Sequence, residues 1–390
     1  MKPRFMDIVV CPLDKRPLEL LEWEAEPTVL SDRDVACITA MSFDASAFSR
    51  EIVTGVLVNR IKKVFYPIYR RVPRLLTSPS ALTREFVKLH RDRIARELPG
   101  FTLPHEKPAP GEEDILRSFS KEWVSYDWNP RAYWNLPPED MYRSMRFLMD
   151  LDGRPIRHNL VLEMGIGIGG IADYVSRSEG CEVVGVDLGY AVDAAQKNFG
   201  ENPMLHIVQA SSFAPPFREN TFDFVYSQGV IHHTYSTRAA FQQLAKLPKT
   251  GGRLYIWVYS PYDYDMNRNW QHRFLMKMER ILRPVMWRLP DRLQTLALAP
   301  IVPLYIAYEN FHLRRDDKAF IKYGPREAMH AARDRFTPRY AHRHTEDEVS
   351  GWFREAGYTD LQCASKRKRP GFLPIWLILH TAVDGVRSQA

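Results

Sequence analysis

The chain has 390 residues, more than one ordinary hydrophobic core uses, so we expect two domains or one domain with large additions. Its composition, 45% hydrophobic and 26% charged, is that of a folded protein and excludes a mainly disordered chain. The 54 Lys and Arg residues against 47 Asp and Glu give a net charge of +7, which suits an anionic small molecule, a nucleic acid or a membrane surface about equally.

The chain contains four scattered cysteines, Cys11, Cys37, Cys181 and Cys363. Because none forms a C-x-x-C pair, we expect neither a disulfide framework nor an intact zinc site. The apolar run near the start is too short for a signal peptide, so we expect a reducing, cytoplasmic location. The apolar stretches 293–308 and 372–383 are shorter than the ~20 residues of a bilayer span. We expect them to pack in the core, with contact to a membrane surface as the alternative.

Two runs in the first 80 residues, CPLDKRPLEL (11–20) and GVLVNRIKKVFYPIYRRVPRLL (55–76), resemble the small zinc-ribbon proteins that partner and activate methyltransferases. The four positions that hold zinc ligands in that family are occupied here by Cys11, Asp14, Asn59 and Lys62. Since a lysine ammonium group does not bind zinc, the resemblance implies a ribbon that has lost its metal and is held by packing. It would serve as a scaffold or dimerisation surface; an unrelated β-rich cap is the alternative.

The most regular part of the sequence follows at 151–260. Apolar strands are expected at 159–165, 181–187, 204–210, 222–229 and 251–259, with helices at 169–180, 190–199 and 237–247. Such alternation predicts a parallel sheet covered by helices on both faces. Near the C-terminus, a helix over 344–358 begins with a capping box of Thr345 and Glu348. Strands around 358–365 and 374–383 then complete the sheet.

The first of these strands runs into VLEMGIGIGG (161–170), whose glycines fit the turns of both dinucleotide-binding and S-adenosylmethionine (SAM) enzymes. Glu163 favours SAM, because a carboxylate beside the turn would repel a pyrophosphate but can orient the cationic methionine end. Two later stretches, PPFRENTFDFVYSQGVIHHT and KTGGRLYIWVY, resemble the fourth- and fifth-strand regions of class I SAM-dependent methyltransferases. The resemblance implies a Rossmann-like, doubly wound α/β sheet and SAM rather than a nicotinamide or flavin nucleotide.

The same resemblance implies a cofactor site formed by Glu163, Gly165, Gly167, Gly169, Asp187, Leu188, Ser211, Ser212 and Gln228. Glu163 and the glycines would line the path of the methionine and ribose, and Asp187 would bind the ribose diol. Leu188 would pack on the adenine, and Gln228 would lie beside the sulfonium. Ser211 and Ser212 stand where many members have an adenine-binding Asp, so their role is less secure, and simple loop hydrogen bonding is the alternative.

The acceptor side has two groups of candidates. His232 and His233 follow the fourth strand and are the catalytic candidates, because imidazole titrates near neutral pH. A base is needed only if the acceptor must lose a proton, so a structural role for these histidines stays open. The expected substrate contacts are aromatic and basic residues, namely Trp123, Tyr126, Tyr259, Tyr262, Arg339, Tyr340, His342 and His344. The alternatives are that the aromatic residues belong to the core and that the basic residues pair with nearby acids.

We therefore divide the chain into a degenerate ribbon (1–80), a helical linker and cofactor lid (81–150), a SAM-binding domain (151–260 and 336–390) and a helical insertion over the acceptor site (261–335). The expected function is methyl transfer by in-line displacement to an O, N or S atom of a small polar or anionic metabolite. The second hypothesis is methylation of RNA or a translation component. A non-catalytic SAM-binding scaffold and a membrane-surface enzyme are further alternatives, and a homodimer is left open.

Overall fold

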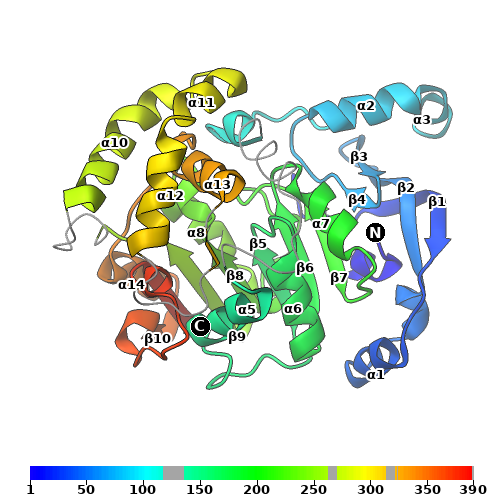
Figure 1. Cartoon of the computed structure of the whole chain (residues 1–390). Helices are drawn as coiled ribbons and strands as arrows, with labels where there is room; N and C mark the ends of the chain where they lie inside the picture. Colours follow the sequence, from blue (N-terminus) through cyan, green and yellow to red (C-terminus); the bar gives the residue numbers. More distant parts are fainter. Residues whose placement is uncertain (117–135, 262–269, 313–320, 323, 389–390) are drawn as a thin grey trace.

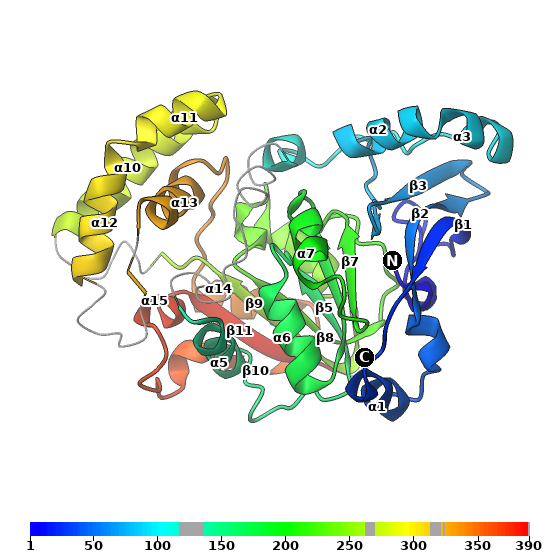
Figure 2. The same cartoon turned by 45° about the vertical axis from the view of Figure 1, so that its right-hand side comes forward.

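The structure is a computed structural model that describes residues 1–116, 136–261, 270–312, 321–322 and 324–388. Within these residues a four-stranded sheet belongs to the N-terminal part and a seven-stranded sheet forms the centre (Figure 1). The N-terminal sheet lies beside one edge of the central sheet, and a group of helices lies on the other side of the molecule (Figure 2). The class of fold expected from the sequence, an α/β sheet with a small N-terminal β-rich part, is confirmed.

The N-terminal sheet is antiparallel in the order β1-β2-β3-β4. Its strands are β1 (Glu19–Pro27), β2 (Arg50–Asn59), β3 (Val64–Tyr69) and β4 (Val72–Pro73), with α1 (Asp32–Ala40) between the first two and α2 (Ala81–Leu89) and α3 (Arg91–Glu97) after them. Most apolar residues in and next to the two ribbon-like runs are buried, namely Val9, Leu18, Val56, Leu57, Tyr66, Ile68 and Leu75, whereas Ile61 is 65% exposed. Packing of apolar side chains therefore stabilises this domain.

Hydrogen bonds join three of the four positions that would hold zinc ligands, Asp14, Asn59 and Lys62, whereas the Cys11 sulfur lies 3.2 Å from the Tyr66 hydroxyl. The side-chain amide of Asn59 donates to both carboxylate oxygens of Asp14, at 3.0 and 3.1 Å. The Asn59 Oδ1 atom accepts from the backbone amides of Ile61 and Lys62, both at 3.0 Å. Hydrogen bonds thus link the two loops that zinc would link in the resembling family. That the protein holds no zinc stays a prediction.

The central sheet has the order β10-β11-β9-β8-β5-β6-β7. Its strands are β5 (Leu160–Met164), β6 (Glu182–Asp187), β7 (Leu205–Gln209), β8 (Phe222–Gln228), β9 (Pro248–Val258), β10 (Tyr358–Cys363) and β11 (Thr381–Arg387). β5 to β9 are parallel, whereas β11 lies antiparallel between β9 and β10. The helices around it are α5 (Pro138–Leu148), α6 (Gly170–Glu179), α7 (Ala191–Phe199), α8 (Thr237–Leu244) and α14 (Glu346–Glu355). The chain adds strands to either side of β5, so the carboxyl ends of β5 and β8 form the crevice where such sheets bind ligands.

The strand expected at 374–383 is wrong in its first half. The structure has a short helix, α15 (Ile375–Ile378), and β11 begins only at Thr381. Leu377 is buried under the sheet, and its carbonyl accepts a hydrogen bond of 2.9 Å from the Trp257 indole. A short run that is apolar at nearly every position has no periodicity that separates helix from strand, and Pro374 at its start favours a helical turn.

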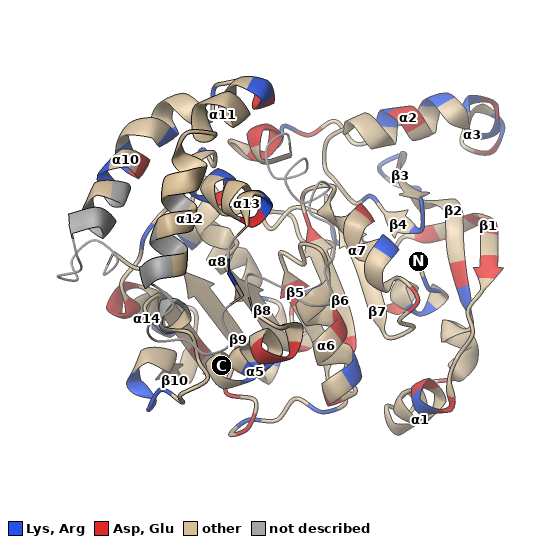
Figure 3. Ribbon diagram, in the orientation of Figure 1, with Lys and Arg blue, Asp and Glu red and all other residues tan. Residues whose placement is uncertain are grey.

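The insertion after β9 forms a helical group of its own. It contains α10 (Trp270–Met286), α11 (Asp291–Leu298), α12 (Ile301–His312) and α13 (Pro325–Phe336), and Lys and Arg residues lie on its outer helices (Figure 3). Met286 and Leu298 pack on Phe336 in a small core. The expectation that the stretch 293–308 packs in the core is only partly right, because Leu296 and Leu304 are 69% and 70% exposed. None of the described helices is long and apolar enough to span a membrane.

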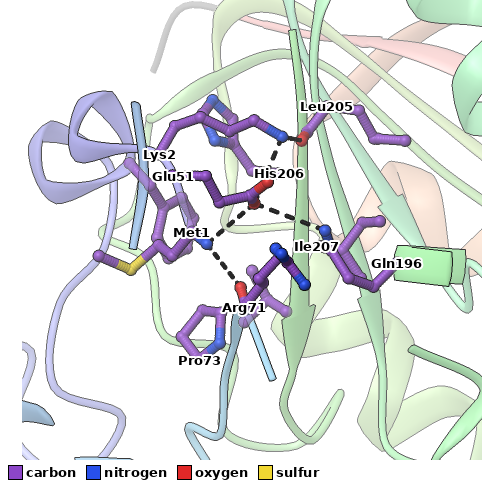
Figure 4. Close-up of a pocket in the computed structure, with 11 residues that line it drawn as sticks. Met1, Lys2, Glu51, Arg71, Pro73, Gln196, Leu205, His206 and Ile207 are labelled. Atoms are coloured by element: carbon purple, nitrogen blue, oxygen red, sulfur yellow. Dashed lines mark hydrogen bonds and ion pairs between the residues drawn. The ribbon is translucent and has the colours of Figure 1, made fainter. Parts of the chain in front are cut away.

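The N-terminal domain contacts the central sheet along β7. Arg74 forms a parallel bridge with Gln209, and the Leu75 amide donates to the Gln209 carbonyl at 2.8 Å. The Arg74 guanidinium is fully buried and pairs with Asp193 at 2.5 Å. Figure 4 shows a second contact, in which the buried Lys2 ammonium donates to the carbonyl of Leu205 at 3.2 Å and also faces Glu51. Buried charges that are paired across the boundary fix the orientation of the two parts.

Candidate cofactor and acceptor site

The loop after β5 requires glycine at three positions. Gly165, Gly167 and Gly169 have φ angles of +95°, +52° and +93°, a region that other residues rarely adopt. A Cβ atom on Gly165 would lie 2.1 Å from the Val230 side chain, and one on Gly169 would lie 2.9 Å from the Phe199 ring. The glycines therefore serve both the conformation of the turn and its close packing against neighbouring residues.

Glu163 lies near the end of β5 and is buried, with 4% of its surface exposed. The pKa of its carboxyl group is raised to about 8, mainly by burial and also by the nearby Asp187 carboxylate, whereas the Tyr226 hydroxyl and the Ala172 amide oppose the rise. The Oε2 atom has no hydrogen-bond partner among the described residues. A buried, incompletely paired acid at this loop fits a cationic ligand group and not a phosphate.

Asp187 ends β6 and ties the glycine loop to the next loop. Its two carboxylate oxygens accept hydrogen bonds from the amide of Gly167 at 3.2 Å and the amide of Gly189 at 2.9 Å. Burial raises the pKa of Asp187, and the same two amides oppose that rise. The following residue, Leu188, is partly exposed, and its carbonyl accepts from the Gln209 side chain at 2.9 Å. Both residues stand where the resemblance expects the ribose and adenine, and these roles stay predictions.

Glu112 lies beside the candidate cofactor residue Ser211, a contact that the sequence did not indicate. The hydroxyl of Ser211 donates to its carboxylate, and Ser211 also accepts from the Phe213 amide at 3.0 Å. Glu112 is 5% exposed, and burial raises its pKa. The segment before β5 thus brings a carboxylate next to the turn at Ser211. Ser212, the next residue of the turn, is partly buried.

His232 and His233 form a short turn after β8, close to the glycine loop because Val230 packs over Gly165. The His232 ring is fully buried, lies 4.0 Å from the Tyr259 ring, and has no hydrogen-bond partner for either nitrogen among the described residues. Burial holds its pKa well below the ordinary value, so it is neutral at pH 7. His233 Nδ1 donates to the Tyr340 carbonyl at 2.9 Å, which leaves Nε2 without a proton in the neutral ring.

The segment 339–344 runs alongside these residues. The His342 amide donates to the His232 carbonyl at 2.9 Å, and the His344 amide donates to the Tyr259 carbonyl at 2.8 Å. The rings of Tyr340 and His342 stack with their centroids 5.9 Å apart. The structure therefore brings together most of the candidates for the acceptor site. Gln228 ends β8 nearby, and its side-chain oxygen accepts from the Tyr255 hydroxyl at 3.0 Å.

Three of the four basic side chains of this segment have acidic partners, which was the alternative to substrate binding. Arg339 pairs with Asp114 at 2.5 Å, and His344 lies 3.0 Å from Glu348. Arg343 pairs with the buried Glu279 at 3.2 Å. The remaining candidates Trp123, Tyr126 and Tyr262 lie outside the described residues. A substrate role for all of these residues stays a prediction.

Comparison with known proteins gives two domain matches. Residues 162–256 match the model of a methyltransferase domain, and residues 2–70 match that of the Trm112p-like proteins. The chain therefore carries a SAM-dependent methyltransferase domain behind a Trm112-like domain. Both resemblances seen in the sequence are confirmed, and so is SAM as the cofactor of this class of domain.

Individual relatives cover only part of the chain. It is 32% identical over 123 residues to the sterol 24-C-methyltransferase ERG6 of Saccharomyces cerevisiae, which is 30% of this chain and 32% of that protein. It is 22% identical over 209 residues to phosphoethanolamine N-methyltransferase 2 of Caenorhabditis elegans, covering 51% and 44%. A solved complex of the Haloferax volcanii Trm112 methyltransferase activator with a methyltransferase has a TM-score of 0.39, at 12% identity, covering 70% of this chain and 98% of that one. The chain thus spans about a third of the sterol methyltransferases it matches.

Proposed function

We propose that the protein transfers a methyl group from SAM to a small polar molecule whose acceptor atom lies beside His232 and Tyr259. SAM, when bound, supplies a methyl group on a positively charged sulfur. The observation that carries the proposal is the juxtaposition of two buried clusters at the carboxyl ends of β5 and β8. One cluster contains carboxyl groups that have no cationic partner among the described residues, and the other contains neutral imidazoles.

Three acidic residues would each contact a different polar group of the cofactor along the crevice. Glu163 would hold the methionine ammonium, because a positive charge restores the ionised carboxylate that burial disfavours. Asp187 would accept from the ribose hydroxyls, with its two amide contacts fixing its orientation. Glu112, placed by Ser211, would accept from the adenine amino group in place of the Asp that the sequence lacks.

The histidines would act on the acceptor. Methyl transfer requires the acceptor atom, the methyl group and the sulfur to be in line, with water excluded. A neutral His232 or His233 can take the proton of a hydroxyl or ammonium acceptor. The Tyr259 ring, which lies beside the His232 ring, would orient that imidazole. Arg339 and Arg343 are already paired with carboxylates. The described residues therefore favour an uncharged polar acceptor over an anionic acceptor bound by these two arginines.

The named activities of the relatives, on sterols and on phosphoethanolamine, support a small-molecule acceptor. The test is incubation of the purified protein with methyl-labelled SAM and a cell extract, with and without ribonuclease. We expect the label in a product of low molecular mass that ribonuclease does not affect, and we expect it to disappear with His232→Ala. Label only in RNA or protein would overturn the small-molecule proposal.

The second candidate, methylation of RNA or a translation component, is supported by the Trm112-like domain at residues 2–70. It predicts a labelled product of high molecular mass, sensitive to ribonuclease if it is RNA and to protease if it is a protein. The same incubation therefore separates the two candidates.

A further inference from the structure

The helical insertion exposes an apolar surface on its outer layer. Figures 1 and 2 show α10, α11 and α12 on the side of α13 that faces away from the central sheet. The large apolar side chains exposed on these three helices, with exposed fractions from 48% to 70%, are Phe274, Ile281, Val285, Leu293, Leu296 and Leu304. We call these six residues the outer apolar face. They account for six of the ten large apolar side chains that are exposed among the described residues.

The helical geometry turns this face away from the small core of the insertion. On α10, Phe274, Ile281 and Val285 fall within about 40° of one another at 100° per residue, so they form one stripe. On α11, Leu296 lies about 200° from the buried Leu298, and on α12, Leu304 lies about 200° from the buried Val302. Each helix therefore packs one side on α13 and exposes large apolar side chains to solvent on another side.

Basic residues accompany the outer apolar face. Lys277, Arg280, Arg288 and Arg292 are exposed on or between α10 and α11. Among the described side chains of these helices no carboxylate is exposed, because Glu279 is 1% exposed and Asp291 is half-buried. A surface of exposed apolar residues bordered by positive charge is typical of helices that lie in the interface of an anionic bilayer.

We propose that the outer apolar face docks on the surface of an anionic lipid bilayer. Its apolar side chains would enter the boundary of the acyl chains while the basic residues contact the lipid phosphates. A second copy of the chain fits less well, because a two-fold contact would place these like charges against each other. RNA fits less well because its charged phosphate backbone would not bury the exposed apolar side chains.

Co-sedimentation with vesicles tests the proposal and does not depend on the proposed function, because neither SAM nor an acceptor is present. Vesicles with about 30% phosphatidylserine are compared with pure phosphatidylcholine vesicles at low and high salt. We expect binding only to the anionic vesicles and a clear loss at high salt. Two double variants, Ile281→Glu with Leu296→Glu and Lys277→Glu with Arg292→Glu, should each lower the bound fraction about tenfold.

The matched control is Ile61→Glu with Leu89→Glu, which changes two apolar residues that are 65% and 61% exposed on the N-terminal domain. We expect it to bind vesicles like the wild type, and thermal unfolding shows that each variant is folded. Wild-type protein that stays in the supernatant with anionic vesicles would overturn the proposal, as would full binding by the Ile281→Glu, Leu296→Glu variant. Loss of a dimer in that variant, without vesicle binding by the wild type, would assign the face to self-association and overturn it too.

Discussion

The unusual state of Glu163 leads to a measurable coupling between protons and SAM. With a pKa of about 8 its carboxyl group is mostly protonated at neutral pH in the absence of ligand. Binding of the methionine ammonium requires the ionised form, so a proton leaves when SAM binds. For a group with this pKa, the association constant of SAM should fall about fiftyfold between pH 8 and pH 6.

Calorimetry with wild-type protein and Glu163→Gln at both pH values measures this coupling. Glutamine keeps the shape of the side chain and has no proton to lose, so we expect weaker binding at pH 8 and little change between pH 8 and pH 6. Glu219→Gln, at an exposed acid outside the site, is the control and should behave like the wild type. Equal pH dependence in the wild type and in Glu163→Gln would refute the role of this carboxylate.

The same group also affects stability in the absence of SAM. Between its ordinary pKa, about 4.5, and its raised value, about 8, Glu163 is protonated in the folded state and ionised in the unfolded state. Unfolding then releases a proton, so the free energy of unfolding should fall by up to about 1.4 kcal/mol per pH unit as the pH rises through this window. Glu163→Gln should lose this slope in chemical denaturation.

Four further predictions concern the site and the N-terminal domain. Asp187→Ala should weaken SAM binding at least about tenfold in calorimetry because the ribose loses a charged acceptor, and unchanged affinity would refute that role. Wild-type protein should bind S-adenosylhomocysteine more tightly than its inosine analogue, which lacks the adenine amino group, and Glu112→Gln should reduce that preference. The same preference in the wild type and in Glu112→Gln would show that Glu112 only orients Ser211. Arg74→Ala leaves Asp193 without its buried partner and should lower the free energy of unfolding by about 3 kcal/mol in urea, whereas a loss below about 0.5 kcal/mol would contradict a structural role for the pair. Elemental analysis should find no stoichiometric zinc, and one zinc per chain would contradict the hydrogen-bonded replacement of the ligand set.

The sequence predicts those features that depend on neighbouring residues. The strands from β5 to β9, the glycine loop and the capped helix α14 follow from local periodicity and turn chemistry, and their positions agree with the structure within a few residues. The buried residues of the ribbon could be predicted for the same reason. The short helix α15 could not, since a run that is apolar at nearly every position has no hydrophobic period.

Other features depend on contacts between distant parts of the chain. Glu112 reaches Ser211 across 99 residues of sequence, and no motif around Glu112 indicates that contact. The pairing of Arg339 with Asp114 and of Arg343 with Glu279 is also long-range, so an apparent cluster of free cations became a set of ion pairs. In the insertion, hydrophobicity alone does not show whether a leucine such as Leu296 faces the core or the solvent.

The most direct test of methyl transfer is the formation of S-adenosylhomocysteine by the purified protein. It is measured by mass spectrometry after addition of SAM and a ribonuclease-treated, low-mass fraction of cell extract. We expect one methylated small molecule to appear for each S-adenosylhomocysteine formed, and both to form much more slowly with Asp187→Ala when SAM is below saturation. SAM that binds tightly but is never converted, with extract fractions of any size, would contradict the account and leave a binding domain without catalysis.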